Sequence, residues 1–445
     1  MRWFAGSRSL GLRLGSAVIA AVSLLGAACS GDSGGSGGSG SNSGSGPLVV
    51  GILAPFTGQD AALGPAYFAA CLPAVRAINA AGGVQGHQLQ CKQFDTRGDP
   101  ADAVPATRQM IASNSNLMMV IGCTSDEAAS VMPILEQAKI PAFCQTGQSE
   151  FNKSKFKYFH RLVPPDEYDA YAMVGIARFY DKFTRIALVF GNDIGSQAFV
   201  EPAKKAIEKN GGVVAINQAL ALGQPSYRTE VQKLIDSKPD VILTEALGST
   251  DATYLSELKQ LKGSMIPVIG SSATIDPVWF KAVSDAIGVA DVLKYYQAND
   301  TPTDFQGAGY EEFRTNLLAS VGDFANAPKY TKRASTIHLY DGVVMTALAM
   351  ETAKSSDRAT YNPAIIKVGN GVSGATEVNT YKAGLEALKA GKAVRFIGGG
   401  GATKFDQYQN SQTGYVIAKY DEKGDEQVIA QLSQDQIDTL IKSAQ

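Results

Sequence analysis

The sequence predicts an α/β protein with two lobes, each built on a doubly wound parallel sheet. Short apolar runs alternate with stretches of helical spacing, and this alternation is typical of βαβ units in a parallel sheet. The alternation restarts after Pro164-Pro165, which indicates a second lobe. The part of the chain that follows a Gly/Ser-rich segment has about 400 residues, more than one ordinary domain of ~100–200 residues contains.

The first lobe is expected to begin with four strands separated by three helices. The first strand ends at a turn rich in Pro and Gly, and the helix after it carries Tyr67, Cys71 and Ile78 on one face. Gly82 and Gly83 stop that helix. The expected strands are 47–56, 89–94, 117–123 and 140–145, and the expected helices are 61–80, 99–114 and 127–138.

The second series of elements has the same rhythm, so it predicts a lobe of the same kind. The expected strands are 184–192, 213–218, 240–246 and 266–272, and the expected helices are 170–180 and 197–210. Beyond Tyr295 the spacing predicts two more helices, at about 310–320 and 337–352. A last helix and two strand-like segments, 414–420 and 426–432, complete the chain.

The N-terminal residues predict export. Three arginines precede an apolar run over about 14–25, and small residues close that run before Cys29, as in a secretory signal. The run is shorter than the ~20 apolar residues of a spanning helix. The residues before Cys29 resemble a bacterial lipobox, although Gly26 stands where leucine is usual. We expect 1–28 to be a signal peptide and Cys29 to be lipidated; an ordinary signal peptide with an incidental cysteine is the alternative.

The segment after Cys29 predicts a tether. Residues 30–46 are almost entirely Gly and Ser, and such a segment behaves as a flexible coil. Its r.m.s. reach is about 20–25 Å. Residues 29–46 would therefore hold a globular protein at the outer face of the bacterial cell membrane, with the lipid on Cys29 as its only membrane contact.

Charge and motif content argue against several other functions. The formal net charge is −2 and both signs are interspersed, so nothing predicts a nucleic-acid partner. The three histidines, His87, His160 and His338, stand in separate settings without an evident nucleophile, and no phosphate-binding loop is present. The glycines between 369 and 374 match a dinucleotide pattern by letters alone, without the preceding strand. We expect no catalytic residue, no cofactor and no metal.

Four cysteines follow Cys29: Cys71, Cys91, Cys123 and Cys144. An even number in an exported protein predicts two disulfides, for which four cysteines allow three connectivities. Proximity along the chain and the expected strand positions favour Cys71–Cys91 and Cys123–Cys144. A zinc site is the alternative, but the spacings contain no Cys-x2-Cys pair.

Several segments, in order along the chain, resemble the branched-chain amino-acid-binding (Leu/Ile/Val-binding) proteins of ABC transporters. They include VVGILAPFTGQDAALG, VIGCTSDEA, YFHRLVPPDEYDAYA, ALVFGNDIGSQAF, KPDVILTEALGSTDATYLSELKQL and STIHLYDGVVMTALAM. The resemblance implies a type I periplasmic-binding fold, whose lobes are joined by a three-segment hinge. The lobes would comprise 47–163 plus 292–397 and 164–291 plus 398–445. It also implies a monomer that delivers a small solute to a permease with ATPase subunits.

The resemblance places ligand contacts in turns after the first-lobe strands. Thr124 and Ser125 match the turn that presents a hydroxyl and backbone N–H groups to the ligand carboxylate, although each would also suit an N-cap. Thr146 and Gln148 match the turn that binds the ligand's amine, although a solvated loop is equally compatible. The first-lobe candidates are Thr57, Gln59, Leu63, Thr124, Ser125, Thr146 and Gln148.

The second lobe departs from the family at three positions. Ile194 and Leu247 stand where aromatic side chains are common, and Ser272 stands where an acid pairs with the α-ammonium. A buried ammonium without a carboxylate would be costly, and Glu245 or Asp251 is a possible substitute. We therefore expect an amino acid, an aromatic acid, a short organic acid or another polar metabolite as the solute. A sensor lipoprotein that uses the same cleft is the alternative function.

Overall fold

The computed structural model describes residues 46–58, 60–303, 305–411 and 414–444. The predicted signal peptide, Cys29, nearly all of the Gly/Ser segment and the candidate Gln59 lie outside these ranges. Within them, no helix is both long enough and apolar enough to span a membrane.

The first sheet is parallel throughout, with strand order β2-β1-β3-β4-β5. Its strands are β1 (Leu48–Ala54), β2 (Leu89–Asp95), β3 (Leu117–Thr124), β4 (Ala142–Gln145) and β5 (Phe159–His160). Successive side chains of a strand point to opposite faces. Val50 and Ile52 of β1 therefore join a core with α1 (Leu63–Ala80) and α12 (Ala334–Ala353), whereas Val49 and Leu53 join a core with α2 (Pro100–Ser113) and α3 (Ser125–Gln137).

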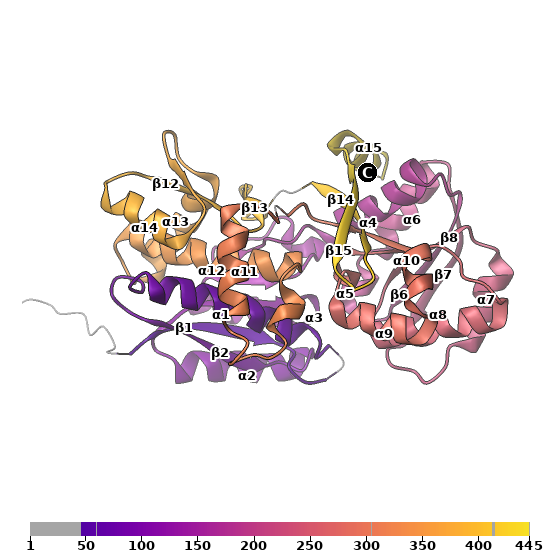
Figure 1. The fold of residues 1–445 in the computed structure, drawn as a ribbon, viewed down its shortest axis with the longest axis horizontal. Helices are drawn as coiled ribbons and strands as arrows, with labels where there is room; N and C mark the ends of the chain where they lie inside the picture. The colour runs from indigo at the N-terminus through magenta and orange to yellow at the C-terminus, as the bar shows by residue number, and fades with distance from the viewer. Residues whose placement is uncertain (1–45, 59, 304, 412–413, 445) are drawn as a thin grey trace, which may run out of the picture. The chain divides into compact units, whose positions relative to one another are not determined.

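A later segment of the chain returns to cover the first sheet. Helix α12 is buried over most of its length, as expected for a helix that is apolar all round, and it contacts α1 although the two are far apart in sequence (Figure 1). Around it lie α11 (Ala308–Leu318), α13 (Arg358–Asn370), α14 (Tyr381–Lys389) and the short helix η4 (Ala327–Tyr330). A small sheet of β11 (Thr376–Val378), β12 (Val394–Gly398) and β13 (Gly401–Ala402) completes this lobe.

The second sheet is mixed, with strand order β15-β14-β10-β9-β8-β6-β7. The strands β6 (Arg185–Gly191), β7 (Val213–Leu220), β8 (Val241–Glu245), β9 (Val268–Gly270) and β10 (Tyr296–Asp300) are parallel. At one edge β14 (Tyr415–Tyr420) pairs antiparallel with β10 and forms a hairpin with β15 (Glu426–Leu432). This hairpin adds an antiparallel edge to the doubly wound sheet that the sequence predicts.

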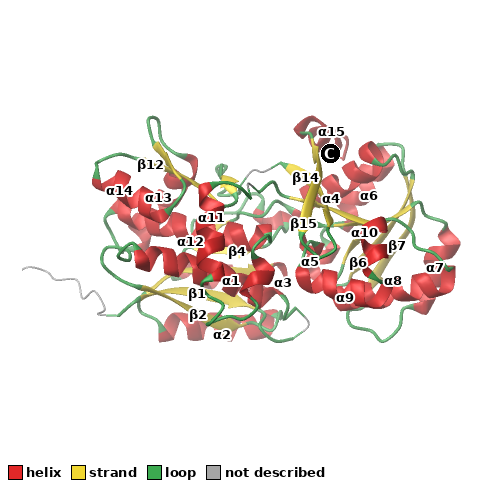
Figure 2. Ribbon diagram, viewed as in Figure 1, coloured by secondary structure: helices red, strands yellow, loops and turns green. Residues whose placement is uncertain are grey.

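Helices cover both faces of the second sheet (Figure 2). One face carries α4 (Asp166–Gly175) with its π-helical extension η2 (Ile176–Tyr180), α6 (Val200–Lys209) and α15 (Gln434–Ala444). The other carries α7 (Arg228–Ser237), α8 (Gly248–Lys262), α9 (Pro277–Ile287) and α10 (Val289–Tyr295). The short helices η1 (Ser149–Phe151), α5 (Ile194–Gln197) and η3 (Ser272–Thr274) lie in turns after strands.

Two of the chain crossings lie later than we expected. Strand β10 pairs with β9 and β14 in the second sheet, so the crossing follows Asp300 rather than residue 291. Strand β13 pairs with β12, and a bridge joins Asn410 to Arg161 of the first lobe, so the last crossing follows Ser411 rather than residue 397. The segment of β10 contains buried Gln297, Asn299 and Asp300, and it therefore lacks the apolar run that would have predicted a central strand.

Candidate functional site

A cavity of about 230 Å³ opens where the carboxyl ends of strands from both sheets meet. Residues after β3, β4, β8, β9 and β10 line it, together with the first turns of α4, α9 and α12. In open parallel sheets this end of the strands is where ligands bind, because turns and helix N-termini converge there. The cavity is therefore the candidate ligand site.

The sequence-predicted contact residues divide into three groups. Five of them line the cavity: Leu63, Thr124, Ser125, Leu247 and Ser272. Gln148 and Ile194 instead line a neighbouring, more open pocket of about 460 Å³. Thr57 is exposed and donates to Asp95, with 2.5 Å between the oxygens, whereas Thr146 is fully buried and its Oγ1 accepts from Ser125 Oγ at 3.2 Å.

Both predicted disulfides are present in the structure, Cys71–Cys91 between α1 and β2 and Cys123–Cys144 between β3 and β4. The second joins the two strand ends that carry Thr124 and Gln145 into the cavity. Cys123 has a φ of 41°, a left-handed conformation that costs free energy in a residue other than glycine. The backbone turns there, and the register of the β3–β4 pair shifts.

Eight acidic side chains line the cavity, a feature that sequence reasoning missed apart from Glu245. The carboxyl groups belong to Asp60, Asp126, Asp166, Asp169, Asp193, Glu245, Asp276 and Asp300. Among the described lining residues only Arg333 and His338 are basic types. The sequence did contain a sign of these acids. The segment PPDEYDAYA, at the first crossing between the lobes, puts Asp166 and Asp169 in the first turn of α4.

Ser272, which stands where the family usually has an acid, is hydrogen-bonded to the carboxylate of Asp169. Asp169 is buried in the first turn of α4, and its carboxylate accepts hydrogen bonds from Ser272 Oγ at 2.6 Å and from Asn299 Nδ2 at 3.0 Å. Burial raises the pKa of Asp169 to about 6, against the lowering effect of the Ser272 hydrogen bond. The family position after β9 thus carries a hydroxyl that binds an acid supplied by another element.

Asp166 and Glu245 each present a buried oxygen, Oδ2 and Oε2 respectively, that has no hydrogen-bond partner among the described residues. Burial raises the pKa of both groups well above the usual range, and the Asp169 carboxylate adds to the effect at Asp166. The side chain of Gln145 lines the same cavity and also has a buried polar atom without a partner among the described residues, Nε2. These three atoms are free to bind a ligand.

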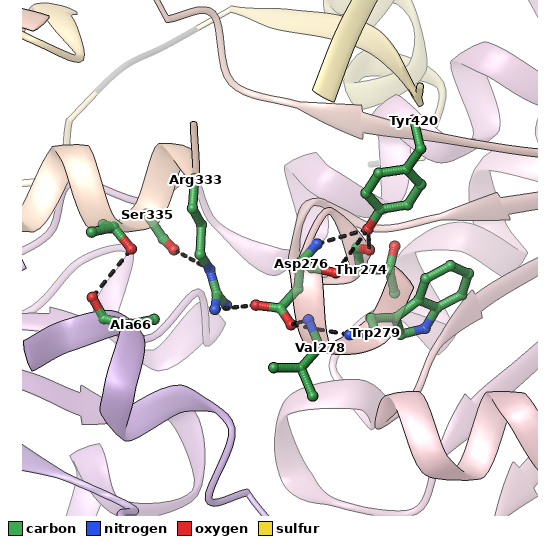
Figure 3. Close-up of polar contacts among 9 residues, drawn as sticks. Ala66, Thr274, Asp276, Val278, Trp279, Arg333, Ser335 and Tyr420 are labelled. Atoms are coloured by element: carbon green, nitrogen blue, oxygen red, sulfur yellow. Dashed lines mark hydrogen bonds and ion pairs between the residues drawn. The ribbon is translucent and has the colours of Figure 1, made fainter. Parts of the chain in front are cut away.

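Two of the contacts between the lobes lie beside the cavity. Arg333, which precedes α12, forms an ion pair with Asp276, the N-cap of α9, and each side chain is only 7% exposed (Figure 3). Asp276 Oδ1 also accepts from the backbone N of Val278 at 2.7 Å, which fixes the carboxylate. In the second contact, Asp126 Oδ1 accepts from the backbone N of Ile194 at 3.1 Å. Asp126 therefore binds the N-terminus of α5 on the opposite lobe.

The free energy of unfolding of the ligand-free protein should fall as the pH rises from about 6.5 to about 8. Burial raises the pKa of Asp60 and of Asp251 to about 7, whereas an unfolded aspartate has a pKa of ~3.9. The folded state therefore holds protons that the unfolded state has lost. Their stabilising effect is complete below pH ~4 and is lost as the pH rises through ~7.

Buried histidines change the free energy of unfolding in the opposite direction, but only at lower pH. Burial lowers the pKa of His160 and His338 to about 4, so their effect on stability ends near ~6.5, where unfolded histidine loses its proton. Calorimetric melting between about pH 6.5 and 8 tests the sign. Asp251→Asn should make the dependence shallower, and a melting temperature that rises over this interval would contradict the prediction.

Comparison with known proteins agrees with this geometry. The chain matches the model of a family described as periplasmic binding protein over residues 47–425. A Leu/Ile/Val-binding protein of Rhizobium johnstonii is 21% identical over 338 residues, which are 75% of this chain and 87% of that protein. An amino acid binding protein of Pseudomonas aeruginosa is 22% identical over 305 residues, 63% of this chain and 80% of that protein.

Solved structures share the fold at low sequence identity. The branched-chain amino acid transporter substrate binding protein of Streptococcus pneumoniae, in complex with isoleucine, has a TM-score of 0.68 at 17% identity and covers 86% of this chain and 99% of its own. A solute binding protein of an ABC transporter from R. palustris, in complex with benzoate, has a TM-score of 0.67 at 16% identity and covers 87% and 96%. The chain therefore belongs to the periplasmic binding protein family and has its type I fold.

Proposed function

We propose that this chain is an extracytoplasmic solute-binding lipoprotein that holds a small polar solute between its lobes and delivers it to an ABC importer. The single observation that carries the proposal is the cavity of about 230 Å³, lined from both sheets at the carboxyl ends of their strands. A solute that touches both lobes favours their closed arrangement, and a membrane partner can recognise closure. Leu63, Thr124, Ser125, Leu247 and Ser272 are the sequence-predicted residues that we propose as contacts.

A solute panel tests this function. The purified full-length chain is unfolded and refolded to remove any bound solute, and its melting temperature is measured with neutral amino acids, aromatic acids, dicarboxylates, amides, sugars and amines. A solute at a hundred times its Kd stabilises the folded state by ~2.7 kcal/mol. A rise with one chemical class, and loss of uptake of that solute in cells without the protein, would support the proposal.

Two other results have distinct meanings. Binding with unchanged uptake in those cells would favour the sensor function. No shift with any class, from a protein shown to be folded, would contradict solute binding itself.

Gly147→Ala should weaken binding of the identified solute by about tenfold or more, ~1.4 kcal/mol per factor of ten. A Cβ at Gly147 would lie 1.8 Å from Asp166 Oδ1 and 2.7 Å from the Asp166 backbone N, so the carboxylate must move. Gly195→Ala is the matched control, because Gly195 lines the same cavity but a Cβ there meets no atom closer than 3.4 Å. Titration calorimetry on both variants gives the comparison; equal affinities would contradict a role for the position of Asp166.

A further inference from the structure

The charges that line the cavity are strongly unbalanced. Eight carboxyl groups face one guanidinium among the described lining residues, and that guanidinium, on Arg333, is already bound to Asp276 and to Ser335 Oγ at 3.0 Å. Burial lowers the pKa of His338 to about 4, so its imidazole is neutral near pH ~7. No basic side chain of the described lining is therefore available to an anionic solute.

The turn after β3 also disfavours an anion. Family resemblance implies that this turn presents backbone N–H groups to a ligand carboxylate. Here the backbone N of Thr124 donates to Glu127 Oε2 at 2.8 Å, and Asp126 and Glu127 both stand in the first turn of α3. The negative charges of this chain already occupy the N-terminal end of the helix, where a ligand carboxylate would otherwise be favoured.

Hydrogen-bond acceptors without donors line the same cavity. Asp166 Oδ2 and Glu245 Oε2 are buried without a partner in the described structure, and both side chains line the cavity. The Asp169 carboxylate accepts from Ser272 and so presents an anchored charge next to them. Buried acceptors in this number are left unsatisfied unless the ligand brings N–H groups.

We propose that the solute is an organic cation, with an amine, amidine or guanidine group bound between the Asp166 and Glu245 carboxylates. This inference rests on the proposed solute-binding function and specifies its substrate class. An N–H-bearing cation supplies several charge-assisted hydrogen bonds at once, which matches the unpartnered oxygens. Two aromatic residues, Tyr67 and Trp279, also line the cavity and can contact the hydrocarbon part of such a solute.

A bound metal ion fits the site less well than an organic cation. Among the described residues, no group of three or more His, Cys, Asp or Glu is placed to hold a metal. The carboxylates are distributed over several elements of both lobes, which suits a solute several atoms long whose N–H groups reach separate acceptors.

Binding of such a cation should release protons. Burial and the neighbouring carboxylates of Asp166, Asp193 and Asp169 raise the pKa of Glu245, so its free form tends to hold a proton that a bound cation would displace. Burial and the carboxylates of Asp169, Glu167 and Asp193 likewise raise the pKa of Asp166, whereas Arg161 lowers it. The affinity for a cation should therefore increase as the pH rises, because the ionised carboxylates bind it.

The test uses Glu245→Gln and Asp166→Asn, with Glu201→Gln, an exposed acid of α6 outside the cavity, as the charge-matched control. The refolded full-length chain is titrated with putrescine, agmatine and arginine, and with leucine, benzoate and succinate. Calorimetry in two buffers of different ionisation enthalpy counts the protons released. Circular dichroism confirms that each variant is folded, and mass spectrometry identifies the solute that co-purifies with the untreated protein.

We expect at least one cation to bind with proton release, and Glu245→Gln and Asp166→Asn each to weaken it about tenfold or more, with Glu201→Gln unchanged. Binding of leucine, benzoate or succinate with equal affinity in all variants would overturn the proposal of a cationic solute and leave the proposed solute-binding function intact. Cation binding that neither substitution weakens would overturn the assigned carboxylates. If no probe binds and no solute co-purifies with the folded protein, the proposed function fails together with the inference.

Discussion

Arg333→Met should open the cleft of the ligand-free protein and increase its radius of gyration in small-angle X-ray scattering. The substitution leaves Asp276, which is 7% exposed and lies among other carboxyl groups, without its only cationic partner among the residues that line the cavity. Breaking a buried ion pair by removing one partner costs about 3–5 kcal/mol, because the remaining charge is desolvated and uncompensated. The lobes can hydrate Asp276 by separating, so the cost should appear as opening rather than as unfolding of either lobe.

A double variant and a surface control make this result specific. Arg333→Met combined with Asp276→Asn removes both charges, and the radius of gyration should return toward that of the unsubstituted protein, since a pair replaced by neutral groups is often nearly neutral in energy. Lys281→Met breaks an ion pair with Asp285 on the same helix α9, where both side chains are exposed. Such a pair contributes only ~0–1 kcal/mol. Unchanged scattering for Arg333→Met would show that the ion pair does not hold the lobes together.

Removal of either disulfide should lower the free energy of unfolding by about 3 kcal/mol. The bridges Cys71–Cys91 and Cys123–Cys144 close loops of nearly equal length, with sequence separations of 20 and 21 residues. The chain-entropy cost of opening each loop is therefore nearly the same. Urea unfolding of the two double alanine variants measures this loss.

Only the second removal should also weaken solute binding. Cys123 holds a left-handed backbone conformation directly before Thr124 and Ser125, and its bridge to Cys144 opposes relaxation of that turn. Without the bridge the two hydroxyl residues can move away from the cavity. The Cys71–Cys91 bridge links α1 to β2, and no residue adjacent to either of its cysteines lines the cavity. The affinity of each variant for the identified solute decides the point; equal losses, or none, would contradict a positioning role for Cys123–Cys144.

Local sequence was informative where an element has a strong periodicity of its own. The apolar strand β3 and the one-sided helix α1 lie within one or two residues of the ranges expected for them, because their side chains are buried in the pattern that strand and helix geometry impose. The polar strand β10 was missed. Its buried Gln297 and Asn299 take their place from neighbouring strands and side chains, which a local pattern does not display.

The candidate site shows the same division. Turns that follow strands are recognisable in sequence, and five of the ten residues expected there line the cavity. The acids Asp166, Asp169 and Asp276 were not recognised as a group, because nothing in the local sequence shows that their side chains face one space. Their convergence depends on the packing of α4 and α9 against the two faces of the second sheet.

The sequence by itself therefore determined the α/β class, the two-lobe organisation and the favoured cysteine pairing, since these follow from periodicity and from proximity along the chain. The tertiary structure alone decided the charge of the cavity and the contacts that join its walls. Ser272 binds Asp169 across 103 positions of sequence, and Arg333 binds Asp276 across 57. Such pairs are set by packing of separate segments, and the free energy of a buried charge depends on which groups that packing brings around it.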